Sequence, residues 1–120
     1  MIKRISRTAF YLGLLAVIAL SVIPQDAMPP TGLWDKAGHT LAYAALAAAG
    51  GVGYPGLRNL AFMAAGLLLL GTALELMQLV LPGRIGSLND VVANAVGVVL
   101  GSFLARGFGA LWPERRRIRR

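Results

Sequence analysis

Four long apolar segments divide this chain and limit what it can fold into. They cover residues 8–23, 36–54, 60–81 and 90–112, and a proline follows or closes each of them. Each is about 16–23 residues long, close to the roughly 20 that an α-helix needs to cross the hydrocarbon core of a bilayer. Lipid offers no hydrogen-bond partner to backbone N–H and C=O groups, so each segment must pair its own. These segments are therefore predicted to be helices. The predicted fold is all-α: a polytopic membrane protein whose four-helix transmembrane bundle forms a single domain over residues 1–120.

The composition agrees with lipid as the solvent of this chain. Hydrophobic residues make up 57% of the sequence and charged residues 14%. A water-soluble chain of 120 residues could not bury so large an apolar surface. The sequence holds no cysteine, which excludes disulfides and thiolate metal sites.

The first segment also has features of a cleaved signal peptide. Lys3, Arg4 and Arg7 form a basic start, and Ala19-Leu20-Ser21 resembles a cleavage site. Three further apolar segments follow, and they favour retention of the first segment as a membrane span.

The basic residues predict the orientation. Ten of the twelve fall before the first segment, between the second and third, or at the end of the fourth and beyond. Only Lys36 and Arg84 lie in the other two connections. The positive-inside rule therefore places both termini in the cytoplasm, with the loops near residues 26–36 and 82–89 on the other side of the cell membrane.

Five arginines crowd into residues 113–120, the predicted basic cytoplasmic tail. Such a run could bind nucleic acid phosphates. It directly follows an apolar segment, however, and a cytoplasmic anchor beside anionic lipid explains it better. Membrane lipids are therefore expected as partners, and nucleic acid is not.

Polar side chains within the predicted spans gather at their non-cytoplasmic ends. Asp35, His39 and Tyr43 are spaced four apart, so they share one helix face. Glu75 is the least expected of these residues in a bilayer, because an intramembrane carboxylate marks a functional site by default. We predict one shared ligand-binding site, made of Asp35, Lys36, His39, Tyr43, Glu75, Gln78, Arg84, Ser87, Asp90 and Asn94. His39, Glu75 and Asp90 are the candidate catalytic residues, and a single histidine with scattered carboxylates predicts no metal and no cofactor.

Several of these residues also have purely structural interpretations. Asp35 could be the N-cap of the second helix. Ser87 and Asp90 fit a capping box at the start of the fourth. Tyr43 could be an interfacial aromatic residue, and Arg84 could hold an outer lipid phosphate.

Gly97 and Gly101 have the spacing of a GxxxG motif in the fourth segment. Such a pair allows close helix packing, either between copies of the chain or within one bundle. Packing within one bundle is the favoured interpretation, and the oligomeric state stays open.

Taken together, these residues resemble the motif of the VanZ-like family of membrane proteins. The first block, Asp35-Lys36-Ala37-Gly38-His39 with Tyr43, matches D-K-x-x-H-x-x-x-Y. The second block matches E-x-x-Q, R and D-x-x-x-N-x-x-G in order, through Glu75, Gln78, Arg84, Asp90, Asn94 and Gly97. The similarity covers residues 35–101, the VanZ-like core.

This resemblance implies a bacterial cell-envelope protein and a connection with resistance to glycopeptide antibiotics. The family carries no established reaction, so the resemblance leaves open whether the chain is an enzyme. We expect an outward-facing polar pocket that binds an envelope lipid, a wall precursor, a lipid-linked or glycopeptide ligand, or a membrane partner. The alternative is a membrane-embedded enzyme that acts on an envelope lipid by His/carboxylate acid-base chemistry. A small transporter ranks third, because the charges lie away from the midplane and no repeat is visible.

Overall fold

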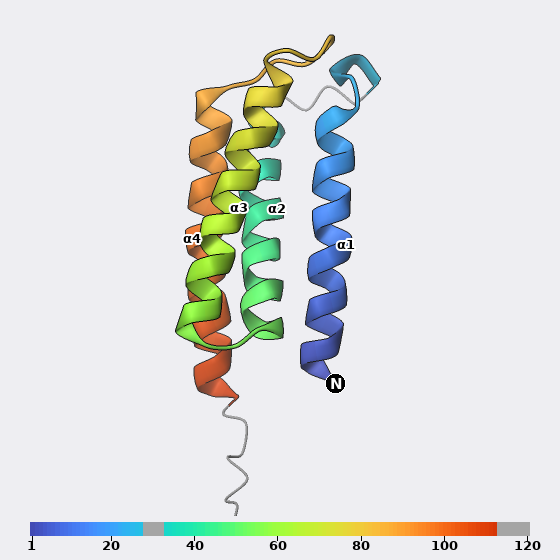
Figure 1. Cartoon of the computed structure of the whole chain (residues 1–120). Coiled ribbons are helices and arrows are strands. Elements are labelled where there is room, and N and C mark those ends of the chain that lie inside the picture. Colours follow the sequence, from blue (N-terminus) through green and yellow to red (C-terminus); the bar gives the residue numbers. More distant parts are fainter. Residues whose placement is uncertain (28–32, 113–120) are drawn as a thin grey trace, which may run out of the picture.

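The computed structural model describes residues 1–27 and 33–112, apart from the side chains of residues 25 and 33–35. Four long helices and one short 3₁₀ helix make up this part of the chain (Figure 1). They are α1 (Ile2–Val22), η1 (Gln25–Ala27), α2 (Leu33–Gly53), α3 (Leu57–Gln78) and α4 (Leu88–Leu111). The prediction of an all-helical chain is confirmed for the described residues. The predicted basic tail, residues 113–120, lies outside them.

Helix α1 begins at Ile2, six residues before the apolar segment predicted to start at residue 8. The basic residues Lys3, Arg4 and Arg7 therefore belong to the helix rather than to a flanking segment. An apolar segment shows which part of a helix lipid can surround. The backbone hydrogen bonds of the helix can continue beyond that part, as long as no residue interrupts them.

Helix α3 lies three residues earlier in the chain than predicted, at both ends. It begins directly after Gly56, whose φ of 116° is open to glycine but strained for other residues. It ends at Gln78, and turns follow before Pro82 and Gly83, which has a φ of 73°. Glu75 is thus about 4.5 Å from the helix end, at 1.5 Å per residue.

Three of the four helices are long and apolar enough to cross a membrane, namely α1, α3 and α4. Helix α2 does not reach that apolarity, because it begins with polar residues such as Lys36 and His39 and continues with alanine and glycine. It packs most extensively against α4 and also contacts α1 and α3. Its neighbours therefore shield much of α2 from the surroundings, and its own passage across the bilayer stays a prediction.

Small residues bring α2 and α4 close together. A Cβ atom added at Gly97 or Gly101 would collide with the α2 backbone at Thr40 or Ala44. The Thr40 hydroxyl also donates a hydrogen bond to the Ala93 carbonyl of α4, at 3.2 Å. The GxxxG pair is thus used for packing within this chain.

Large apolar side chains cover the outside of the bundle. Phe62, Leu69, Phe103 and Leu104 are all more than 60% exposed. The interior is narrow, with Phe10, Tyr43, Leu46, Ala47, Leu67 and Val98 forming its main buried apolar cluster. This inverted distribution is typical of a chain surrounded by lipid.

The bundle has two ends, at which different helix termini meet (Figure 1). The start of α2, the end of α3 and the start of α4 meet at one of them, which we name the polar end. The start of α1, the end of α2, the start of α3 and the end of α4 meet at the other, which we name the basic end. Antiparallel helices joined by short connections impose this alternation.

Candidate functional site

Buried polar side chains gather at the polar end. Among the described residues they are Ser21, Glu75, Gln78, Asp90 and Asn94. Three helices supply the group that we name the polar cluster: His39 and Tyr43 from α2, Glu75 from α3, and Asp90 and Asn94 from α4. Each of these helices therefore contributes at least one polar side chain to a shared interior.

The imidazole of His39 joins α2 to both other helices of the cluster. Its Nδ1 lies 3.0 Å from Asn94 Oδ1 and 3.8 Å from Glu75 Oε1. A carboxamide oxygen only accepts hydrogen bonds, so Nδ1 donates in the contact with Asn94. The His39 side chain keeps 22% of its surface exposed, whereas Glu75 is almost fully buried. His39 is thus the member of this pair that solvent can reach.

Glu75 is held from the connection between α3 and α4. The backbone N–H of Ser87 donates to Glu75 Oε2 at 3.2 Å. His39, Asp90 and Arg84 bring the ionisable groups that lie nearest this carboxylate. One carboxylate oxygen is therefore anchored, and the other is directed toward His39.

The contact with Glu75 replaces the capping box expected at the start of α4. Ser87 is the N-cap residue, but its side chain makes no capping hydrogen bond. In a capping box the N-cap N–H is bound by a side chain three residues later in the same helix. Here the Glu75 carboxylate of α3 accepts that hydrogen bond, and this couples the start of α4 to the polar cluster.

Asp90 brings a second carboxylate to the same place. It is 5% exposed, and its Oδ1 is buried and accepts no hydrogen bond from the described part of the chain. One ligand atom each from His39, Glu75 and Asp90 lie within 4.8 Å of one another. A buried carboxylate oxygen without a partner is costly, so this arrangement favours a proton or a cation beside it.

Gly71 is a part of the site that the sequence did not indicate. A Cβ atom built on it would lie 3.0 Å from Asn94 Nδ2 and 3.1 Å from the Tyr43 hydroxyl. Glycine at this position therefore lets α3 approach both side chains. The signal available in the sequence was its position, one helical turn before Glu75 on the same face.

The other predicted site residues lie around the cluster rather than within it. Gln78 is buried, but its amide donates to the Ser21 carbonyl at 3.1 Å and so ties α3 to α1. Lys36 is exposed near the start of α2, and Arg84 is half-buried in the connection between α3 and α4. The side chain of Asp35 lies outside the described residues.

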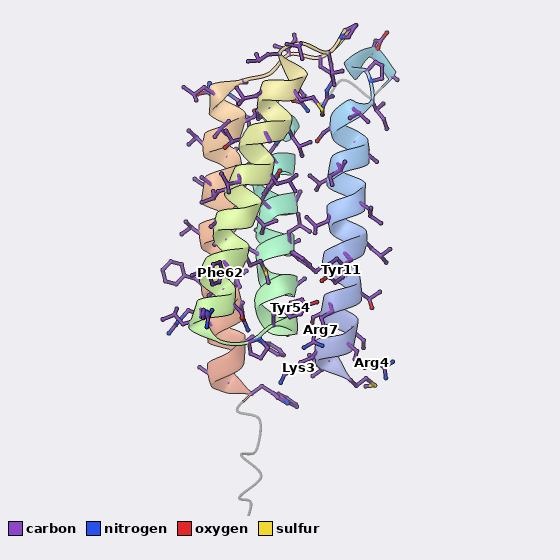
Figure 2. All side chains as sticks on the ribbon, viewed as in Figure 1. Lys3, Arg4, Arg7, Tyr11, Tyr54 and Phe62 are labelled. Atoms are coloured by element: carbon purple, nitrogen blue, oxygen red, sulfur yellow. The ribbon has the colours of Figure 1, made fainter. Side chains whose placement is uncertain are left out.

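One cavity in the described residues lies at the opposite end of the molecule. Its volume is about 560 Å³, and residues from both ends of the described chain, such as Lys3 and Trp112, line it. Nearby, Arg7 donates from Nε to the Gly53 carbonyl at 2.8 Å and lies 4.6 Å from the ring centre of Tyr54 (Figure 2). The polar cluster is thus separate from this cavity.

Comparison with known proteins gives one result. A family model described as VanZ/LLP1 matches residues 8–111, which include all four long helices apart from the first six residues of α1. No curated protein and no solved structure gives a significant match.

Proposed function

The chain belongs to the VanZ/LLP1 family, and on this premise we propose that it binds a phosphate-bearing lipid of the bacterial cell envelope at its polar end. Membership in this family confirms the resemblance seen in the sequence. The observation that carries the proposal is the convergence of His39, Glu75 and Asp90 from three helices. Ionisable groups are rarely placed within membrane helices unless they serve a site.

In this proposal all four long helices cross the membrane, and the polar end faces the non-cytoplasmic side. The distribution of basic residues supports this orientation, since Lys3, Arg4, Arg7, Arg58 and Arg106 all lie at the basic end. The polar cluster would then lie just below the outer headgroups. There it would meet envelope lipids, wall precursors and the outer parts of membrane partners.

The cations at the polar end support a phosphate as the group that is bound. Lys36 is exposed one helical turn before His39, and Arg84 lies close enough to interact electrostatically with Glu75. A guanidinium can bind phosphate in bidentate geometry, and a nearby carboxylate can fix its orientation. Arg84 would thus bind the headgroup while Glu75 positions Arg84.

The proposal is tested by the lipids that the purified protein retains. The full chain is reconstituted in nanodiscs that contain a neutral phospholipid with small amounts of phosphatidylglycerol or a polyprenyl phosphate. Native mass spectrometry then measures the retained lipid. We expect Arg84→Gln to reduce retention at least tenfold, because charge-assisted contacts are among the stronger ones in proteins.

Arg58→Gln is the matched control, because Arg58 is an exposed cation in the first turn of α3, at the basic end. It should leave retention of either lipid unchanged. Equal losses for the two variants would mean that lipid is held by charge alone, and no loss for Arg84→Gln would contradict the proposal. The two lipids distinguish a general headgroup site from one for wall-precursor carriers.

One observation favours an enzyme as the second candidate function. His39 is part-exposed, and Asn94 and Glu75 orient it, which is the arrangement of a general acid or base. An enzyme would convert one of the lipids above into a product of different mass. His39→Gln would abolish that conversion and leave lipid retention intact, whereas a pure binding protein would show no conversion in either form.

The connection with glycopeptide resistance is tested in cells. If the bound lipid is a target of such antibiotics, expression of the wild-type chain should raise the inhibitory concentration of a lipid-bearing glycopeptide. Arg84→Gln should not raise it, and Arg58→Gln should act like the wild type. Equal susceptibility of all strains would separate lipid binding from resistance.

A further inference from the structure

We propose that His39, Glu75 and Asp90 bind one divalent transition-metal ion, with Zn²⁺ as the best match. This site goes beyond lipid binding and does not depend on it. It rests on three observations: the distances within the polar cluster, the burial of both carboxylates, and the hydrogen bonds that orient the ligands.

The distances are close to those of a metal site. Nitrogen and oxygen ligands lie at roughly 2.0–2.2 Å from Zn²⁺, so two ligands of one ion lie at most about 4.4 Å apart. The ligand atoms of His39, Glu75 and Asp90 all lie within 4.8 Å of one another. A small inward rotation of the side chains would therefore place all three in contact with one ion.

The burial of the carboxylates supports a cation between them. Exposed acidic residues often gather without a metal, but Glu75 and Asp90 are only 4% and 5% exposed. Asp90 Oδ1 accepts no hydrogen bond from the described residues, although it is buried. Two such carboxylates repel each other, and a divalent ion would remove the repulsion and supply the missing partner.

The surrounding hydrogen bonds resemble those that orient metal ligands. Ser87 N–H holds Glu75 Oε2 and leaves Oε1 directed at His39. Asn94 Oδ1 accepts from His39 Nδ1 and fixes the imidazole between α2 and α4, so the ion would be bound by the other ring nitrogen, Nε2. Outer contacts of this kind are regular features of protein metal sites.

The donor set indicates the class of metal. An imidazole with carboxylates suits zinc, manganese and iron, and the absence of cysteine excludes thiolate coordination. Three protein ligands leave one position of a tetrahedral zinc ion open for water or substrate. The part-exposed side of His39 gives that position a route to solvent.

The proposal is tested on the purified full chain in lipid-free detergent, with any polyhistidine tag removed. The protein is stripped with chelator and dialysed against Zn²⁺ or Mn²⁺, and bound metal is counted by mass spectrometry. We expect one Zn²⁺ per chain. His39→Ala, Glu75→Gln and Asp90→Asn should each weaken binding at least tenfold, and Asn94→Ala should weaken it by roughly 10–100-fold, as outer contacts do.

Asp26→Asn is the matched control, because Asp26 is an exposed carboxylate of η1, next to the end of α1. It should bind Zn²⁺ as the wild type does. Substoichiometric binding by the wild type, or equal binding by the His39, Glu75 and Asp90 variants, would overturn the proposal.

A second measurement needs no variant and therefore does not depend on the folding of one. Co²⁺ added to the stripped wild-type protein should give the visible absorption bands of a four- or five-coordinate ion, and Zn²⁺ should abolish them. A spectrum identical to that of hydrated Co²⁺ would contradict the site. Because no lipid is present, failure here leaves the lipid-retention experiment unaffected, and the converse also holds.

Discussion

The two ends of the bundle handle their charged side chains in opposite ways. At the basic end, cations such as Lys3, Arg4 and Arg7 lie at the surface, and Arg7 is satisfied by one backbone carbonyl and one ring (Figure 2). At the polar end, Glu75 and Asp90 are buried between helices. Surface charges of this kind cost little to keep, whereas buried ones require partners. The comparison teaches that the basic end leaves its charges at the surface, whereas the polar end must satisfy its charges inside the bundle.

The largest effect expected from this difference concerns the side of the membrane that each end faces. The chain has no cysteine, so a single introduced thiol reports its own location. Ile85→Cys at the polar end and Leu57→Cys at the basic end are both exposed positions, at 78% and 68%. A membrane-impermeant maleimide added to intact cells should label Ile85→Cys and leave Leu57→Cys unlabelled until the cells are opened. The reverse pattern would invert the proposed orientation.

Within α4, the position of Gly97 against α2 should be far less tolerant than the position of Gly107 near the basic end. Gly97→Leu would force a side chain into the α2 backbone, whereas Gly107 has open space around it. Overpacking costs roughly 1–3 kcal/mol where side chains can yield, and more where backbone must move. Gly97→Leu should therefore abolish the peak of the folded protein in size-exclusion chromatography, and Gly107→Leu should behave as the wild type. Equal tolerance of both changes would contradict the close packing of α4 against α2.

A subtler change sharpens the comparison within one helix. Gly71→Ala places a methyl group 3.0–3.1 Å from Asn94 and Tyr43 and should displace them by a few tenths of an ångström. Gly66→Ala, on the same helix, meets nothing within 4 Å, and it should stabilise the chain by up to about 1 kcal/mol through helix propensity. Only Gly71→Ala should weaken lipid retention. We expect a threefold to tenfold loss, because a tight contact of this kind costs roughly 1 kcal/mol. Identical retention by both variants would exclude Gly71 from the site.

The smallest effect on the polar cluster is expected from a change at the basic end. Arg7→Gln removes the hydrogen bond to Gly53 and the contact with Tyr54. Thermal unfolding in detergent should show a loss of about 1–2 kcal/mol, typical of one hydrogen bond from a charged group. Lipid retention and metal content should not change. A loss of either would show that the two ends are coupled.

The sequence predicted the helices because lipid imposes both their length and their apolarity. It singled out the candidate site residues for the same reason, since a carboxylate such as Glu75 is unusual in an apolar segment. Helix ends were harder to predict, because α1 continues through Lys3, Arg4 and Arg7, and α3 stops short of Pro82. A hydropathy pattern indicates whether lipid or water surrounds a helix. The residues at which the helix begins and ends are determined by other features of the sequence.

Partners across helices could not be predicted from spacing alone. The capping box at Ser87 was a sound local interpretation, yet a carboxylate twelve residues earlier takes the N–H. Gln78 shares a helix face with Glu75 but contacts Ser21 of α1 instead of the cluster. The choice of partner depends on how each helix is rotated relative to its neighbours. Helical periodicity shows which residues share a face of one helix, but not which neighbour that face contacts. The sequence likewise could not show that three ligand atoms converge. Its expectation of no metal stays a prediction, against which the Zn²⁺ proposal stands.

The most direct test of the central claim is a double-mutant cycle between His39 and Glu75. The free energy of unfolding is measured in detergent for the wild type, His39→Ala, Glu75→Gln and the double variant. If the two side chains work as one unit between α2 and α3, their effects should be non-additive by about 0.5–3 kcal/mol. Additivity within roughly 0.3–0.5 kcal/mol would mean that they act independently, and the polar cluster would then not be a single site.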